Sequence, residues 1–272
     1  MLISRRTTLS LRSVAIVYLV LLLLLPVGVV FVRTFEHGFS AAWGWMTTPA
    51  AVSAFWLTLL VAVIAVPLNT IFGVGAALVL VRSKTRGRAI LDALIDLPFV
   101  VSPVIVGLAL ILVYGQTGWF GTWFTDHGIR IIYATPGIVL ATIFVSLPFV
   151  VREVAPVLVE VGDEQEQAAA TLGASSWQTF RRVTLPSIRW GVAYGVVLTT
   201  ARALGEIGAV LVVSSNVAGQ TLTLPLLVYQ RSSDLGNQAV TSAYAAATEL
   251  AVMSLVVLLA MTVLGPRRED TR

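Results

Sequence analysis

The sequence predicts an all-α, polytopic membrane protein with about six transmembrane helices. Its 272 residues are 57% hydrophobic and only 12% charged, whereas soluble domains carry about 25% charged residues. The mean hydropathy is +0.89. The apolar residues fall into separate blocks, and a helix of about 20 apolar residues is long enough to cross a bilayer. Lipid is therefore the expected solvent for most of the chain.

We expect six spans, and the first of them resembles a signal sequence because it follows Arg5, Arg6 and Arg12. Its apolar run is too long and no small-residue cleavage site follows, so we expect it to be retained. Pro98 and Pro103 interrupt the third span, which favours a helix that faces protein or a pathway. The spans are Val14–Val32, Val52–Val81, Ile90–Tyr114, Pro136–Val151, Ile188–Val213 and Ala243–Leu264.

The basic residues set the expected orientation. Fourteen of the 18 Lys and Arg residues fall on the side that holds both termini and the long insert after the fourth span. Arg33, Arg130 and Arg231 fall on the other side, and Arg202 lies within the fifth span. The positive-inside rule makes the first side cytoplasmic. We divide the chain into a cytoplasmic tip, first span and outer loop (1–50), a core domain (51–265) and a cytoplasmic tail (266–272).

The loop after the third span carries interfacial aromatics, including Trp119 and Trp123. We expect the stretch Gly118–Gly128 to form a short helix in the headgroup region. A platform that binds sugars or aromatic ligands is the alternative.

The cytoplasmic insert between spans four and five, Arg152–Arg189, is the most informative stretch. Its first half, Glu160–Leu172, is rich in helix-forming Glu, Gln and Ala, and Gly173 offers a C-cap. Ser175 and Gln178 match a capping box that would begin a second helix. We therefore expect two helices joined by a glycine elbow.

The second helix would place Trp177 and Phe180 on one face, and aromatic residues are enriched at binding hot spots. Pro186 fits the first turn of span five, where its missing N–H has no cost. Such an ordered insert favours docking onto a soluble partner, and a solvated connector is the alternative.

The spacing of this insert resembles a motif of the permease subunits of ATP-binding-cassette (ABC) importers. That motif is Glu-Ala-Ala, three residues, Gly, nine residues, a β-branched residue, one residue and Leu-Pro. Gln167 replaces the family's glutamate, and the adjacent Glu166 points about 100° away on a helix. The resemblance implies a coupling helix pair that docks into a groove of an ATP-hydrolysing subunit. Its residues would be Glu166, Gln167, Ala168, Ala169, Gly173, Trp177, Phe180, Leu185 and Pro186.

Four further stretches resemble the sulfate and thiosulfate branch of this family, and within it the second of two paired permeases. They are residues 96–110, 184–191, 201–210 and 219–226. The resemblance implies a heterodimer with a second permease, two ATP-binding subunits and an external substrate-binding protein. The chain has no Gly-x-x-x-x-Gly-Lys-Ser/Thr loop, so we expect no cofactor on it, with ATP and Mg on the partner. A molybdate, tungstate or other oxyanion permease is the alternative.

Charges within the spans are the candidate pathway residues. Arg202 and Glu206 are four apart and share a helix face, so they form an internal salt bridge or line the pathway. Ser102, Thr199 and Thr200 are the neutral candidates.

Three acidic residues in the spans have other expected roles. Asp92 and Asp96 are interpreted as charges near a helix N-terminus, with a gate as the alternative. Glu249 has no local partner, and Arg202 or the second permease could supply one.

Other function classes find less support. The chain has no cysteine, and its two histidines, His37 and His127, lie outside the apolar blocks. We therefore expect neither a metal site nor catalytic residues, which disfavours an intramembrane enzyme. A secondary transporter or channel would favour an inverted repeat, and the spans have no clear one.

Overall fold

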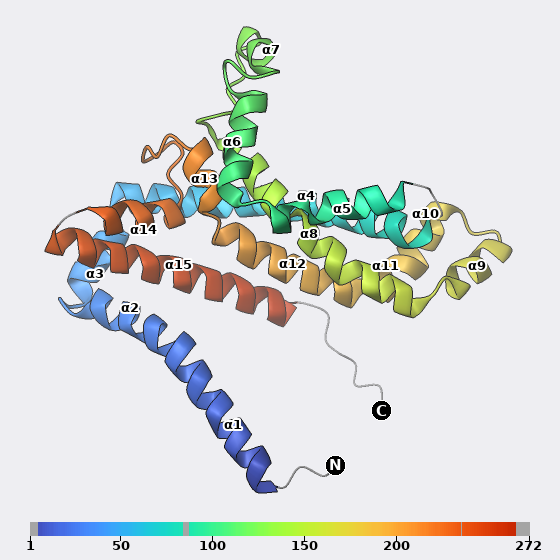
Figure 1. Cartoon of the computed structure of the whole chain (residues 1–272), viewed down its shortest axis with the longest axis horizontal. Helices are drawn as coiled ribbons and strands as arrows, with labels where there is room; N and C mark the ends of the chain where they lie inside the picture. The colour runs from blue at the N-terminus through green and yellow to red at the C-terminus, as the bar shows by residue number, and fades with distance from the viewer. Residues whose placement is uncertain (1–4, 84–86, 235, 265–272) are drawn as a thin grey trace.

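The computed structural model describes residues 5–83, 87–234 and 236–264, and every regular element within them is a helix (Figure 1). The elements are α1 (Arg5–Leu19), the π-helical turn η1 (Val20–Leu24), α2 (Leu25–Phe35), α3 (Phe39–Met46), α4 (Pro49–Arg82), α5 (Arg88–Val100), α6 (Pro103–Tyr114), α7 (Gly121–Asp126), α8 (Thr135–Val161), α9 (Glu164–Thr171), α10 (Ser176–Thr179), the π-helical turn η2 (Phe180–Thr184), α11 (Leu185–Ser187), α12 (Arg189–Leu204), α13 (Gly208–Val213), α14 (Leu224–Ser233) and α15 (Asn237–Leu264). The expected tail, residues 266–272, lies outside the described residues.

The helices α4, α8 and α12 form the centre of the molecule, and α4 and α8 share the most extensive packing. Thr48 caps α4 by accepting a hydrogen bond from the Ala51 N–H, and Pro49 occupies the first turn. Inside the bundle the Asn69 amide donates to Ser146 Oγ of α8 at 2.8 Å. Hydrogen bonds of this kind join helices in lipid.

Glycines let these helices approach closely. A Cβ on Gly195 would lie 2.8 Å from Val150 Cα of α8, and one on Gly191 would lie 2.8 Å from the Glu153 carbonyl oxygen. The small-residue pair Gly191 and Gly195 therefore lets α12 pack closely against α8.

The N-terminal helices form an arm. Residues Arg12–Phe35 are continuously helical and apolar enough to span a membrane, which agrees with the predicted first span. In Figure 1, α1 extends away from the other helices, whereas α2 approaches α15. Thr34 and Thr248 join α2 to α15 through a hydroxyl–hydroxyl contact of 2.7 Å.

Within the described residues, four helical stretches are long and apolar enough to cross a membrane. A fifth is counted if α5 and α6 together form one span, although they bend by 112° at their junction. The expectation of about six spans is thus met in part. The predicted third span is not one straight helix, and α6 and α7 stand away from the layer that contains α4 and α8 (Figure 1). The predicted fifth span is divided into α12 and α13.

Two predicted boundaries are wrong for one physical reason. The fourth span was expected to end at Val151, but α8 continues to Val161. Glu160 therefore belongs to α8, and the first helix of the insert begins at Glu164 instead. Arg152 ends the apolar block but not the helix, because arginine is a good helix former. The helix α8 ends instead before Gly162, whose φ is +73°.

Candidate functional site

The insert folds into the two helices that its sequence predicts. Gly173 has φ +83° and ends α9. Its N–H donates to the Ala170 carbonyl at 3.0 Å, and the Ala174 N–H donates to the Ala169 carbonyl at 3.1 Å. This is a Schellman motif, which satisfies the last carbonyls of a helix. Ser175 and Gln178 then form both hydrogen bonds of the capping box at the start of α10.

The helix pair lies at one end of the molecule, beyond the ends of α4 and α8 (Figure 1). Leu172 is 88% exposed and Trp177 is 68% exposed. The Trp177 ring stacks on Phe180 with a centroid distance of 5.6 Å, and Phe180 packs against the buried cluster around Val150 and Leu158. Leu172 and Trp177 thus form an exposed apolar surface, and Phe180 packs Trp177 against the core.

The nine residues expected to contact a partner divide into two groups. Exposed are Gln167, Ala168, Gly173, Trp177, Leu185 and Pro186, whereas Glu166, Ala169 and Phe180 are partly covered. Pro186 lies in the short helix α11, which follows the π turn η2 and precedes α12.

Glu166 turns toward the membrane helices. Its carboxylate accepts a hydrogen bond from Arg82 Nε at 3.0 Å and one from Thr184 Oγ1 at 2.9 Å. Gln167, the next residue, is exposed. The two neighbours therefore face different surroundings, as the helical geometry predicts, and Glu166 does not take the place of Gln167.

Two helix breaks lie side by side in the structure. One is the bend between α5 and α6, where Ser102 precedes Pro103 and has extended backbone angles. A residue before proline disfavours the helical conformation. The other break separates α12 from α13. A Cβ on Gly208 would approach Pro103 Cβ to 2.9 Å and Glu206 Oε1 to 3.7 Å, so the two breaks are in contact.

Arg202 and Glu206 form an ion pair at the second break. The Glu206 side chain is only 2% exposed, whereas that of Arg202 is 29% exposed. Glu206 Oε1 also accepts a hydrogen bond from the Ala209 N–H at 2.8 Å, which satisfies a free donor at the start of α13. The sequence left two roles open for this pair, and its geometry fits a structural tie with one partly accessible cation.

In the part of the chain that the structure describes, the neutral pathway candidates make no hydrogen bond to this pair. Thr200 Oγ1 donates to the Val196 carbonyl of its own helix at 2.7 Å. Thr199 is fully buried and its hydroxyl has no hydrogen-bond partner among the described residues. Ser102 is exposed at the bend. The structure thus joins Arg202 to Glu206, and no hydrogen bond between described residues links the three hydroxyls to this pair.

The interpretation of Asp92 and Asp96 is corrected. Neither lies in the first turn of α5, which begins at Arg88. Arg152 of α8 donates from NH2 to Asp92 Oδ1 and from Nε to Asp96 Oδ1, both at 2.8 Å. The two carboxylates therefore tie α5 to α8. The spacing of four residues predicts that Asp92 and Asp96 share a helix face. Their partner Arg152 could not be predicted, because rules based on sequence spacing act only over a few residues.

Glu249 has a different electrostatic neighbour from the partners that the sequence suggested, namely Arg231. Arg231 also donates to the Ser242 carbonyl at 3.1 Å and to Thr48 Oγ1 at 3.0 Å. Burial lowers the pKa of the Arg231 guanidinium from its ordinary value, and the Glu249 charge opposes that shift. This group joins α14 and α15 to the start of α4.

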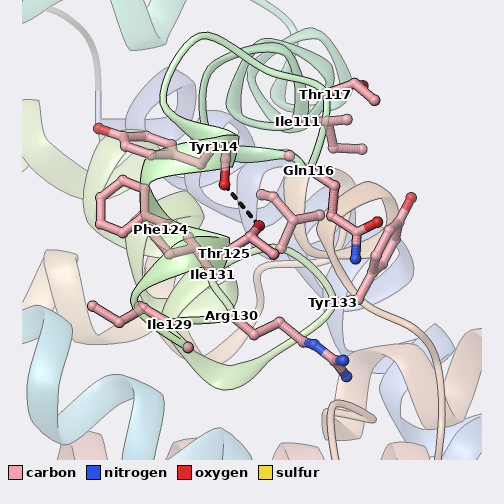
Figure 2. A pocket seen from close by; sticks show the side chains of 14 residues that line it. Ile111, Tyr114, Gln116, Thr117, Phe124, Thr125, Ile129, Arg130, Ile131 and Tyr133 are labelled. Atoms are coloured by element: carbon pink, nitrogen blue, oxygen red, sulfur yellow. Dashed lines mark hydrogen bonds between the residues drawn. The ribbon is translucent and has the colours of Figure 1, made fainter.

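A cavity of about 600 Å³ lies between the end of α6, the short helix α7 and the segment before α8. The helix α7 falls within the predicted stretch Gly118–Gly128. Figure 2 shows Gln116 beside Tyr133 on one side of the cavity, with Arg130 near them and the rings of Tyr114 and Phe124 opposite. In the described part of the chain no group of three or more His, Cys, Asp or Glu comes together.

Comparisons with known proteins agree with this architecture. Residues 69–270 match the family model of the binding-protein-dependent transport system inner membrane component. A bacterial ABC transporter involved in the import of alginate has the same fold, with a TM-score of 0.78 and 19% identity over 98% of each chain. The same kind of transporter in complex with a periplasmic protein bound to an alginate pentasaccharide gives a TM-score of 0.79, with 19% identity over 97% of this chain and 95% of the other.

Sequence relatives are closer. The sulfate transport system permease protein CysW of Synechocystis sp. is 50% identical over 94% of this chain and 91% of its own. CysW of Escherichia coli is 44% identical over 92% of this chain and 84% of its own. The sulfate transport system permease protein CysT of Synechocystis sp. is 39% identical over 90% of this chain and 86% of its own.

Proposed function

The chain belongs to the binding-protein-dependent transport system inner membrane component family, and we propose that it is the permease subunit through which an ABC importer carries sulfate and thiosulfate. The assignment of sulfate as the substrate rests on the 50% identity, over nearly the whole chain, to a permease named for sulfate transport. As an inner-membrane permease of this family, the chain is a non-catalytic multi-pass membrane subunit.

The working complex contains four other chains by this proposal. A second, paired permease completes the membrane part, and two ATP-binding subunits hold ATP and Mg. An external binding protein delivers the anion. The matches to both CysW and CysT of one organism support the paired permease. The solved transporter with its periplasmic protein supports the delivery step by likeness of fold alone.

The coupling step follows from the surface of the insert. The exposed Leu172 and Trp177 on the cytoplasmic helix pair dock onto an ATP-binding subunit, together with the elbow at Gly173. Closure of the two ATP-binding subunits moves this pair, and the membrane helices change between inward-open and outward-open packings. Transmission through two discrete packings is the usual form of such coupling.

In the membrane, the anion passes near the contacting breaks of α5/α6 and α12/α13. Broken helices at membrane depth occur where the chain is buried in protein or lines a cavity. Arg202 is the cation of this region, and its pairing with Glu206 keeps its attraction for a dianion weak. A pathway must bind its ion loosely enough to release it. Six spans, with both termini in the cytoplasm of a bacterial cell, complete the proposed topology.

The test is uptake of radiolabelled sulfate by a deletion strain complemented with this chain and its partner subunits. We expect ATP-dependent uptake that excess thiosulfate suppresses and excess molybdate leaves largely intact. Suppression by molybdate or tungstate would assign the chain to those oxyanions instead. Uptake that continues without a nucleotide-hydrolysing partner would point to a secondary transporter and reject the proposal.

A further inference from the structure

Arg82, the last residue of α4, holds together segments that are far apart in the sequence. Its Nε donates to Glu166 Oε2 at 3.0 Å and its NH2 donates to Glu166 Oε1 at 3.4 Å. The same guanidinium donates to the Leu158 carbonyl at 3.2 Å and to the Gly162 carbonyl at 2.5 Å. One side chain thus joins the end of α4, the end of α8 and the first turn of α9.

Thr184 adds a fourth segment to this group. It is 4% exposed, and its hydroxyl donates to Glu166 Oε1 at 2.9 Å. Thr184 ends the π turn η2. This turn leads from α9 and α10, called the docking helices below, through α11 into α12. Arg82, Glu166 and Thr184 are called the clasp below. Among the side-chain hydrogen bonds and ion pairs of the described residues, those of Glu166 alone fasten α9 to the membrane helices.

The chemistry of the clasp favours a rigid joint. The last carbonyls of a helix lack partners within the helix and attract a cation, which accounts for the Arg82 bonds to Leu158 and Gly162. A guanidinium that meets a carboxylate with two donors fixes direction as well as distance, and lysine cannot reproduce this fork. Both charged side chains are 23% exposed, so the joint is shielded only in part.

The clasp faces a hinge. Only Gly162 and Asp163 separate α8 from α9, and Gly162 has φ +73°. A two-residue link of this kind fixes the distance between the helices but not their angle. The contacts of Glu166 with Arg82 and Thr184 supply the missing constraint.

We propose that the Arg82–Glu166–Thr184 clasp is the joint that transmits movement of the docking helices to α4. Glu166 is thus a positioning residue that acts inside this chain and makes no contact with the ATP-binding subunit. This inference rests on the proposed function only for its transport readout. Without the clasp the docking helices still bind their partner, but α9 turns about Gly162 without moving α4.

The main test compares Glu166→Gln with Glu164→Gln in the assembled complex in lipid nanodiscs and proteoliposomes. Both glutamates lie in the first turn of α9, so both changes remove the same favourable charge at a helix N-terminus. Glu164 makes no hydrogen bond or ion pair with another described residue. We expect Glu166→Gln to keep assembly and ATP hydrolysis but to lower sulfate carried per ATP by about tenfold, the loss typical of a charge-assisted hydrogen bond. Glu164→Gln should behave like the wild type.

A second readout does not depend on sulfate. Because the chain has no cysteine, spin labels can be placed on cysteines introduced at Leu172 and Val79, which are 88% and 48% exposed. The distance distribution between the two labels should be narrow in the wild type and broad in Glu166→Gln. A wild-type complex that fails to carry sulfate rejects the substrate assignment, whereas this measurement tests the clasp alone.

Two further variants make the test decisive. Arg82→Gln should cause the same loss as Glu166→Gln, and the double variant should be no worse, because both changes open one joint. Thr184→Val removes only a hydroxyl. If the complex with Glu166→Gln does not assemble, the distance between the spin labels is measured in Thr184→Val instead. An unchanged distance distribution in Glu166→Gln, or in Thr184→Val in that case, overturns the proposal. Loss of the ATP-binding subunit in Glu166→Gln but not in Arg82→Gln overturns it too, because Glu166 would then be a direct contact.

Discussion

At the residue scale, the buried carboxylate of Glu206 combines two tasks. It pairs with Arg202 and accepts the Ala209 N–H at the start of α13. Removing one member of a buried ion pair costs about 3–5 kcal/mol, whereas replacing both members is often close to neutral. The pair can therefore be tested by comparing single and double substitutions.

We predict that Glu206→Gln leaves the complex assembled and impairs sulfate uptake. Glutamine keeps an acceptor for the Ala209 N–H, but it leaves the Arg202 charge without its partner, so an anion binds Arg202 more tightly and leaves more slowly. Initial rates of uptake and sulfate retention in proteoliposomes measure this effect.

The double variant Arg202→Gln with Glu206→Gln is the control, because it removes both charges and keeps the side-chain sizes similar. It should melt closer to the wild type than Arg202→Gln alone, and it should lose the excess retention of sulfate. Normal uptake by Glu206→Gln would remove Glu206 from the transport step and leave it a purely structural residue.

At the scale of elements, the elbow between α9 and α10 depends on one backbone conformation. Gly173 has φ +83°, and a Cβ there would meet nothing within 4 Å. The cost of Gly173→Ala is therefore conformational rather than steric, about 1–2 kcal/mol for a left-handed residue with a side chain. We predict weaker retention of the ATP-binding subunit by Gly173→Ala, measured by co-purification over a salt series.

Gly219→Ala is a matched control for that prediction. Gly219 has φ +78° and open space around its Cβ position, so the substitution brings the same kind of strain far from the docking helices. It should leave co-purification unchanged. Equal losses in both variants would mean that general destabilisation, rather than the elbow, controls docking.

The caps of α9 and α10 could be predicted from the sequence, whereas the long-range ion pairs could not. The glycine elbow and the capping box obey rules that act over three to six residues, and the prediction from Gly173, Ser175 and Gln178 is confirmed. The pairing of Arg82 with Glu166 spans 84 positions, and no local rule reaches that far. The end of α8 was missed for another reason: the charge of Arg152 ends an apolar block, but the helix continues to Val161.

At the scale of the whole molecule, hydropathy locates apolar blocks but not the path of the chain within them. The block Ile90–Tyr114 is apolar enough for one span, yet the chain turns by 112° between α5 and α6. Pro103 signals a restriction at Ser102, but a kinked helix and a sharp bend share that signal. The packing of α6 against α13 at Gly107 and Gly208 selects the bend, and this contact is tertiary.

This bend makes the membrane topology the most informative global measurement. With six spans and a cytoplasmic N-terminus, residue 119 lies outside the cell and residue 172 lies inside. If α5 and α6 instead enter and leave on the same side, both positions exchange sides, because one crossing is lost before each of them. Single cysteines replacing Trp119 and Leu172, which are 84% and 88% exposed, distinguish the two arrangements in this cysteine-free chain.

We predict that a membrane-impermeant maleimide labels Trp119→Cys in intact spheroplasts and labels Leu172→Cys only after permeabilisation. Denatured samples of both variants control for the reactivity of each thiol. The reverse pattern would show that the α5–α6 pair does not cross the membrane, and the docking helices would then face away from ATP. Since ATP-driven coupling needs Leu172 and Trp177 in the cytoplasm, that single result would reject the six-span topology and the proposed mechanism together.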